Sequence, residues 1–216
     1  MSAISPECTV VLQIDGLHIA HRRLVLRDWT TAISAGVTLV CDEEGESKTD
    51  FLRLLAAELP YAAGRLNFQG VAQHADMSAY RQQVFWIEPS TAEYDEFTVE
   101  GFFSLQASRY AGFDQAALLQ LIDGLALESH LFKQIQMLSS GTRRKVWIAA
   151  AFASGAALTL LDDPLAALDK SSALFVLSRM AALAQAGQRA LVVGDYHAPA
   201  NVPLAARIDL SLMTSA

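Results

Sequence analysis

Apolar positions in the first third of the chain come in short runs that are typical of β-strands. Three such runs, rich in Val, Leu, Ile and Thr, occupy residues 9–17, 24–33 and 36–41. Residues 48–59 instead place Phe51, Leu54 and Leu55 at the spacing of one helix face. The pattern therefore predicts a strand, a polar loop at residues 42–47 and then an amphipathic helix.

The middle of the chain changes from strands to helices. Two further strand candidates lie at residues 64–70 and 83–89, and a helical pattern extends from Thr98 to about residue 135. Within it, Asp114 is a candidate N-cap and Gly124 a candidate helix stop. We expect this stretch to form a helical lobe inserted between strands.

The last third of the chain returns to strands that alternate with a helix. Residues 157–163 and 188–196 predict apolar strands, and residues 171–187 predict a helix that ends at Gly187. Apolar strands separated by helices are typical of a parallel sheet covered on both faces. The predicted fold class is therefore α/β.

The composition fits one packed domain and argues against some partners. With 216 residues, of which 52% are hydrophobic and 18% charged, the chain can bury a large core. A formal net charge of −7 argues against nucleic acid as a partner. The longest apolar run, residues 146–161, contains Ser154 and Gly155 and is shorter than the roughly 20 residues of a membrane-spanning helix. It predicts a buried helix followed by a buried strand.

The N-terminus and the cysteines favour a reducing, cytosolic environment. The first residues carry no positively charged segment and no long apolar core, so we predict no signal peptide. The sequence has two cysteines, Cys8 and Cys41, which lack the spacing of metal ligands.

Residues 42–49, DEEGESKT, partly match the phosphate-binding loop pattern G-x-x-x-x-G-K-[ST]. Lys48 and Thr49 occupy the positions of the phosphate-binding lysine and the Mg²⁺-binding hydroxyl. Asp42 and Ser47 replace the two glycines, and a non-glycine residue forced into left-handed geometry costs about 1–2 kcal/mol. On its own the segment is more typical of a charged surface turn. The predicted strand before it and helix after it favour the phosphate loop.

Two acidic residues end the predicted strand at residues 157–163. Asp162 and Asp163 would lie at the carboxyl edge of a parallel sheet, where ligands bind in such folds. One carboxylate there can hold Mg²⁺ and its neighbour can orient or deprotonate a water molecule. The alternative is an ordinary turn made of Asp and Pro.

A third candidate site is the segment LSSGTRRKV at residues 138–146. Ser139, Ser140 and Gly141 are expected to cap a helix that begins near Thr142, which creates an anion site at the helix N-terminus. The turn that follows contains three basic residues, Arg143, Arg144 and Lys145. Because basic residues oppose the helix dipole there, an external anion would help to explain them. The alternative is an ordinary Ser cap followed by a solvated basic turn.

The order and spacing of these segments resemble the nucleotide-binding subunits of ATP-binding cassette (ABC) transporters. LSSG resembles the signature motif, LTLLDD the Walker B strand, PLAALD with Asp169 the D-loop, and residues 42–49 a degenerate Walker A loop. The short length and the string FWIEP are similar to the haem-exporter ATPase of cytochrome c maturation. The resemblance implies a P-loop NTPase-like core, an N-terminal antiparallel β subdomain and an inserted helical subdomain. It further implies a single domain over 1–216, with the helical lobe at about 98–140.

The resemblance also implies roles for individual residues, with ATP and Mg²⁺ as cofactors. The nucleotide-binding residues would be Gly45, Lys48, Thr49 and Asp162, with Thr49 and Asp162 as the Mg²⁺ ligands. The signature residues facing a partner's ATP would be Ser139, Ser140 and Gly141.

Several positions depart from the family pattern. Ser90 stands at the Q-loop glutamine, Asp163 at the catalytic glutamate, and Asp195 at the switch histidine, with His197 two residues later. The adenine-stacking aromatic is missing, and His18 or His21 would have to replace it.

These departures affect the chain's own ATP site and spare its signature. In this family two such subunits pair head to tail, and each ATP lies between one subunit's Walker A loop and the other's signature. The sequence therefore predicts a degenerate subunit that completes the ATP site of a different, competent subunit. Integral membrane permease subunits would hold it at the cytoplasmic face of the cell membrane. The alternatives are an active homodimeric ATPase and a scaffold or regulator without a transporter.

The segment from Ser90 to about Ser108 is the candidate docking groove for a permease's coupling helix. It contains Phe97, Phe102 and Phe103, which would line the groove. Local core packing explains the same aromatic residues equally well.

Overall fold

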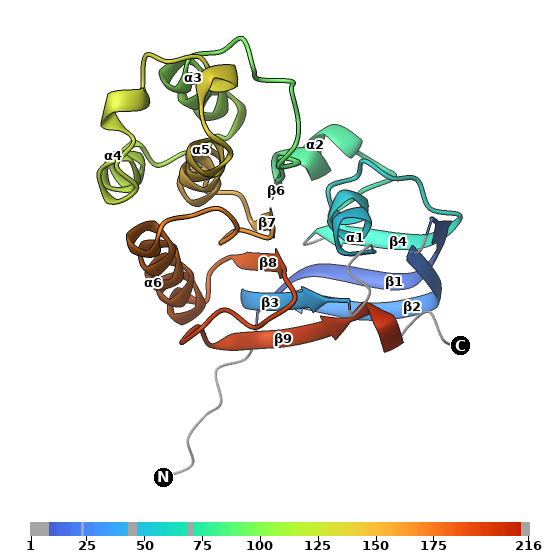
Figure 1. Cartoon of the computed structure of the whole chain (residues 1–216). Helices are drawn as coiled ribbons and strands as arrows, with labels where there is room; N and C mark the ends of the chain where they lie inside the picture. The colour runs from blue at the N-terminus through green and yellow to red at the C-terminus, as the bar shows by residue number, and fades with distance from the viewer. Residues whose placement is uncertain (1–8, 23, 43–46, 69–70, 213–216) are drawn as a thin grey trace.

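The computed structural model describes residues 9–22, 24–42, 47–68 and 71–212, and contains two β-sheets (Figure 1). The first sheet is antiparallel and has the strand order β2-β1-β4-β5. Its strands are β1 (Val10–His21), β2 (Leu24–Ser34), β4 (Ala63–Phe68) and β5 (Val71–Ala72). This sheet confirms the predicted N-terminal antiparallel subdomain.

The second sheet is parallel and has the strand order β6-β7-β8-β3-β9. Its strands are β3 (Gly36–Cys41), β6 (Val84–Phe85), β7 (Leu158–Asp162), β8 (Ala190–Gly194) and β9 (Leu204–Asp209). The predicted strand at 83–89 is reduced to two residues. The sequence pattern missed β9, because this edge strand is mostly exposed and lacks a continuous apolar run.

Both faces of the parallel sheet are buried, which explains why its central strands are continuously apolar. Val37 and Val193 pack into one hydrophobic core, whereas Val40 and Val192 pack into the other. Helix α1 (Ser47–Leu55) lies between the two sheets (Figure 1). The opposite face is covered by α5 (Ser140–Ala153) and α6 (Lys170–Ala186). The expectation of a buried helix and a buried strand at residues 146–161 is confirmed by α5 and β7.

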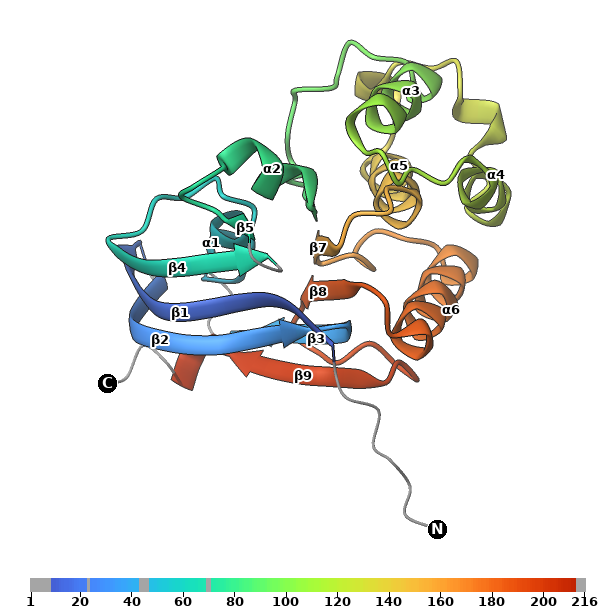
Figure 2. The same cartoon turned by 180° about the vertical axis from the view of Figure 1, so that it is seen from behind.

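A group of helices separates β6 from β7 in sequence and gathers at one end of the molecule (Figure 2). Its helices are α3 (Val99–Arg109), α4 (Gln115–Gly124), η1 (Glu128–His130) and η2 (Ile135–Met137). Asp114 caps α4, and α4 ends at Gly124, as the sequence predicted. Two short helices, α2 (Met77–Gln82) and η3 (Leu210–Leu212), were not predicted. Among the described residues, no helix has the length and apolar character needed to cross a lipid bilayer.

The aromatic residues proposed to line a docking groove belong instead to the core. Phe102 and Phe103 are 0% and 4% exposed. The ring of Phe102 lies 4.8 Å from Trp147 of α5 and 5.1 Å from Tyr94, which joins α3 to α5. Only Phe97 of the three is exposed, so the core-packing alternative is correct for Phe102 and Phe103.

Candidate nucleotide site and signature surface

Lys48 lies at the start of α1 and is buried with its charge. Its side chain is 2% exposed, and Nζ lies 3.6 Å from Oδ1 of Asp163 and 3.3 Å from the ring centroid of Tyr196. Within the described part of the chain, Nζ has no hydrogen-bond acceptor. Because a buried cation needs a compensating partner, this position has the chemistry of an anion site.

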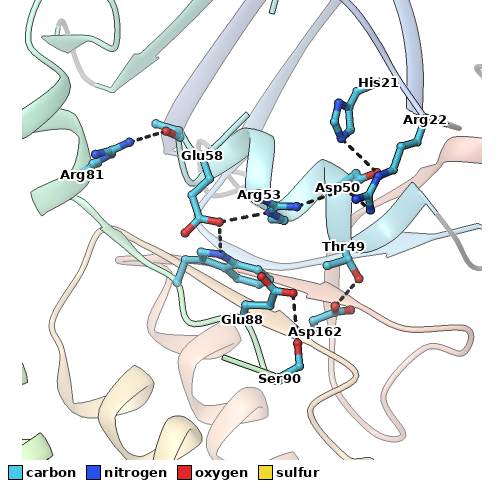
Figure 3. A network of polar contacts seen from close by, with 12 residues as sticks. His21, Arg22, Thr49, Asp50, Arg53, Glu58, Arg81, Glu88, Ser90 and Asp162 are labelled. Atoms are coloured by element: carbon cyan, nitrogen blue, oxygen red, sulfur yellow. Dashed lines mark hydrogen bonds and ion pairs between the residues drawn. The ribbon is translucent and has the colours of Figure 1, made fainter. Parts of the chain in front are cut away.

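Thr49 and Asp162 are brought together at the carboxyl edge of the parallel sheet. The Thr49 hydroxyl donates a 2.5 Å hydrogen bond to Oδ2 of Asp162 (Figure 3). Burial raises the pKa of Asp162, and its Oδ1 is buried without a hydrogen-bond donor among the described residues. A hydroxyl and a carboxylate in contact are the oxygen donors that Mg²⁺ uses. The predicted pairing of these residues is therefore present in the geometry.

Asp42 places a carboxylate where a phosphate loop would offer backbone N–H groups. Its side chain is 6% exposed, and Oδ2 accepts a 2.9 Å hydrogen bond from the N–H of Ser47, the first residue of α1. Neither Asp42 nor Ser47 has a positive φ, so the expected left-handed strain is absent. The departure from a phosphate loop at these two positions is therefore electrostatic. Gly45 lies outside the described residues.

Asp163 is held at the end of β7 in a left-handed backbone conformation, with φ of 42°. Its N–H donates to the Gly194 carbonyl at 2.8 Å. Arg144 of α5 donates to the carbonyl of Asp162 at 3.0 Å and also to the carbonyl of Asp163. The backbone of the strand end is thus fixed from two sides, while the Asp163 carboxylate faces Lys48.

The loop after β8 brings Tyr196 to Lys48. The N–H of Asp195 donates to the Val40 carbonyl at 3.1 Å, and the Asp195 carboxylate accepts from the N–H of His197 at 3.3 Å. Tyr196, between these two switch candidates, makes the described contact with Lys48. The sequence analysis missed Tyr196, because an aromatic residue in a loop belongs to no phosphate-binding motif.

A buried acid on α1 was also missed. Asp50 is 3% exposed and lies 3.9 Å from His21, 3.9 Å from Arg22 and 3.8 Å from Arg53 (Figure 3). His21, a candidate adenine contact, is therefore directed at a carboxylate. Ser90, at the Q-loop position, is exposed and donates to Glu88 at 3.2 Å (Figure 3).

The signature segment forms the N-terminus of α5. Ser139 is the N-cap, and its Oγ accepts from the N–H of Thr142 at 3.1 Å. The helix begins at Ser140, two residues before the expected start. Ser139 and Ser140 are exposed, whereas a Cβ added to Gly141 would lie 2.4 Å from the Ala167 carbonyl oxygen. The glycine therefore permits close packing of α5 against the D-loop.

The three basic residues after the signature have partners within the chain, which corrects the expectation that an external anion explains them. Arg143 pairs with Asp95 at 2.9 Å, and Arg144 binds the carbonyls at the end of β7. Lys145 pairs with Asp169 at 2.6 Å and lowers the pKa of that carboxyl. Asp169 also caps α6. These residues connect α5 to its neighbours and leave the serines at its exposed end.

The site has the cationic and oxygen-donor groups that ATP and Mg²⁺ require, but its anion-binding positions are filled from within the chain. Lys48, Thr49 and Asp162 fit the cofactors by chemistry. The Asp42 carboxylate occupies the N–H of Ser47, and the Tyr196 ring covers Nζ of Lys48. A triphosphate does not fit this arrangement unless those two side chains move.

The fold and the site define a nucleotide-binding domain of the ABC type. The family model described as ABC transporter matches residues 33–166, more than half of the chain. The chain therefore belongs to the ABC transporter family, in its ATP-binding subunit branch.

Relatives of known name lie in several branches of that family. The cytochrome c biogenesis ATP-binding export protein CcmA of Idiomarina loihiensis is 31% identical over 150 residues, 68% of this chain and 67% of CcmA. The zinc transport system ATP-binding protein TroB of Treponema pallidum is 27% identical over 201 residues, 89% of this chain and 75% of TroB. The molybdenum import ATP-binding protein ModC of Methylococcus capsulatus is 30% identical over 137 residues, 62% of this chain but 38% of ModC.

Solved structures show the same fold. An ATP-binding subunit of an ABC transporter superposes with a TM-score of 0.75 at 23% identity, covering 85% of this chain and 79% of that chain. An ABC transporter ATP-binding protein from Pyrococcus furiosus superposes with a TM-score of 0.74 at 20% identity, covering 94% and 98%.

Proposed function

We propose that this chain is a degenerate ATP-binding subunit of an ABC transporter, with weak or absent hydrolysis at its own Walker site. Its signature, Ser139, Ser140 and Gly141, would complete the ATP site of a different, competent subunit. The observation that carries the proposal is an asymmetry between two helix N-termini. The start of α1 is occupied by the chain's own Asp42 carboxylate, whereas the start of α5 is exposed.

Electrostatics explains why the first helix start is a poor phosphate site. An N-terminal N–H is an anion site because of its partial positive charge, and Asp42 already uses that of Ser47. A phosphate about 5 Å from this carboxylate would be repelled by about 3 kcal/mol at an effective dielectric of about 20. That repulsion corresponds to roughly a hundredfold loss of affinity.

The signature end of α5 has the opposite character. Ser139 and Ser140 are exposed, and the basic residues behind them are neutralised by internal partners. The N-terminus of a long helix therefore faces outward without a nearby carboxylate bound to it. A phosphate presented by a second subunit would meet this surface, and Asp169 would lie behind it as the D-loop residue.

The permease would dock at a polar groove of about 250 Å³ beside the aromatic cluster. Its lining includes Arg81, Trp86, Glu88, Glu93, Tyr94 and Arg109. The groove thus combines an aromatic floor with charges of both signs, which suits the end of a partner helix. We propose that permease subunits bind here and hold the chain, a single domain with its helical lobe at about 98–140, at the cytoplasmic face of the membrane.

One observation favours the alternative of an active homodimeric ATPase. The contact between Thr49 and Asp162 preserves the pair that would hold Mg²⁺ at the chain's own site. In that case Asp163, with Asp195 or His197, would serve the chemistry at the same site. The two functions differ in which half of the molecule the transporter's ATPase activity needs.

The test uses the transporter reconstituted with its partner ATPase and permease subunits. Ser140→Glu adds an acid to the first turn of α5, where the helix dipole favours it, but it places a negative charge against a partner's phosphate. We expect a loss of about tenfold to a hundredfold in ATPase activity. Gly141 is a less suitable position, since any side chain there meets the Ala167 carbonyl.

Two further variants complete this test. Ser178→Glu adds the same charge to an exposed position on α6 and is the matched control, with activity within about twofold of the native complex. Lys48→Met keeps the buried volume and removes the ammonium, and it should have a far smaller effect than Ser140→Glu. The opposite order, with Lys48→Met severe and Ser140→Glu mild, would overturn the proposal in favour of the homodimeric ATPase.

A further inference from the structure

The contact between Tyr196 and Lys48 joins two parts of the chain that are far apart in sequence. Tyr196 follows β8, and its ring centroid lies 3.3 Å from Nζ of Lys48 at the start of α1. The lysine is 2% exposed and the tyrosine 55% exposed. The ring therefore lies at the surface and separates the ammonium from solvent.

The ring satisfies a cation that the described polar groups leave without a hydrogen bond. Nζ has no hydrogen-bond acceptor in the described part of the chain, and the Asp163 carboxylate lies 3.6 Å away. An ammonium over an aromatic face is stabilised most when it is desolvated. Tyr196 and Asp163 therefore take the place that an anionic ligand of Lys48 would occupy.

The position of the ring indicates which phosphate it replaces. In a phosphate loop the backbone before the lysine cradles the α- and β-phosphates, and the lysine reaches the β- and γ-phosphates. Tyr196 and Asp163 approach Lys48 from the ends of β8 and β7, away from that backbone. They therefore stand on the side where the terminal phosphate of a triphosphate would lie.

We propose that Tyr196 is a specificity-determining residue that excludes the terminal phosphate from this site. The chain's own cradle would then accept a nucleoside diphosphate in preference to a triphosphate. This inference rests on the proposed weak Walker site and adds the reason for its weakness toward ATP in particular. It is distinct from the effect of Asp42, which lies by the loop backbone and acts on both nucleotides alike.

The experiment measures binding of MgATP and MgADP to the purified full chain by calorimetry. The native chain should bind MgATP no more tightly than MgADP. Tyr196→Leu keeps an apolar side chain of moderate size but removes the aromatic face, and Tyr196→Ala removes the bulk as well. Both should strengthen MgATP binding by about tenfold and change MgADP binding by less than about twofold, the range expected from a desolvated cation–π contact.

Tyr196→Phe is the matched control, because it retains the ring, and should bind both nucleotides like the native chain. The protons on Cε of Lys48 give a second readout: the ring should shift their NMR signals upfield in the native and Phe variants but not in the Leu variant. Equal strengthening of MgATP and MgADP in the Leu and Ala variants, or no change in either, would overturn the inference. Neither result would affect the proposed role of Ser139 and Ser140, which is tested in the reconstituted transporter.

Discussion

Replacing Asp42 by Asn removes a negative charge at the start of α1 and keeps a side-chain oxygen that can accept from the Ser47 N–H. The native carboxylate is 6% exposed and accepts that hydrogen bond at 2.9 Å. Asn is as good as Asp at satisfying N-terminal helix groups. We therefore expect the free energy of unfolding to change by less than about 1 kcal/mol.

Nucleotide affinity should change much more. The carboxylate contributes about 3 kcal/mol of repulsion to a phosphate about 5 Å away at an effective dielectric of about 20. Solvent screening and side-chain rotation reduce this value, so we expect Asp42→Asn to tighten binding about tenfold to thirtyfold. MgADP and MgATP should gain equally, because Asp42 lies beside the loop backbone that holds the phosphates common to both.

The assay combines calorimetric titration of the isolated chain with urea unfolding. Asp76→Asn is the matched control, because Asp76 caps α2 by accepting from the Ala79 N–H at 2.9 Å and is exposed. It removes the same charge from a helix N-terminus outside the site and should leave nucleotide affinity unchanged. Unaltered affinity in Asp42→Asn, with the fold intact, would refute the electrostatic explanation of the poor Walker site.

The remaining predictions concern stability. Burial raises the pKa of Asp162, so the folded state holds that proton more tightly than the unfolded chain, whose pKa is about 3.9. The contribution of this group to stability is complete below about pH 4 and is lost as the pH rises through the folded-state pKa, so Asp162→Asn should gain stability relative to the native chain between pH 4 and pH 7 in urea unfolding; a difference independent of pH would contradict this. Gly155→Ala, with φ of 68° and an added Cβ 2.1 Å from the Gly112 carbonyl oxygen, should lower the melting temperature by about 5–12 °C. Gly187→Ala, with φ of 60° and nothing within 4 Å, is its control and should cost only about 1 kcal/mol; equal losses at the two glycines would show that packing at Gly155 is unimportant.

Local patterns were sufficient for most of the fold. The strands at residues 36–41 and 190–194 are buried on both faces, and a continuous apolar run is the sequence signal of such burial. Asp114, Gly124 and Gly187 mark helix ends by their own side-chain and backbone chemistry, which acts within a few residues. The exposed edge strand β9 was missed, because its stability comes from pairing with β3 and its own residues carry little pattern.

The candidate site shows where local patterns stop. The sequence suggested Arg143, Arg144 and Lys145 as an anion-binding group, since it shows charges but not their partners. Those partners, including Asp95 and Asp169, are distant in sequence and are brought close by the packing of α5.

By itself, the sequence determined the α/β architecture, the order of the phosphate loop, signature and acidic strand end, and the loss of two glycines from that loop. These are properties of spacing and residue type, which the chain carries locally. Only the tertiary structure decided how the altered loop is filled: Asp42 binds the Ser47 N–H, and Tyr196 from the end of β8 covers Lys48. The physical reason is that the lysine's surroundings consist of side chains from β7, β8 and α1, and their distances exist only once the parallel sheet has formed.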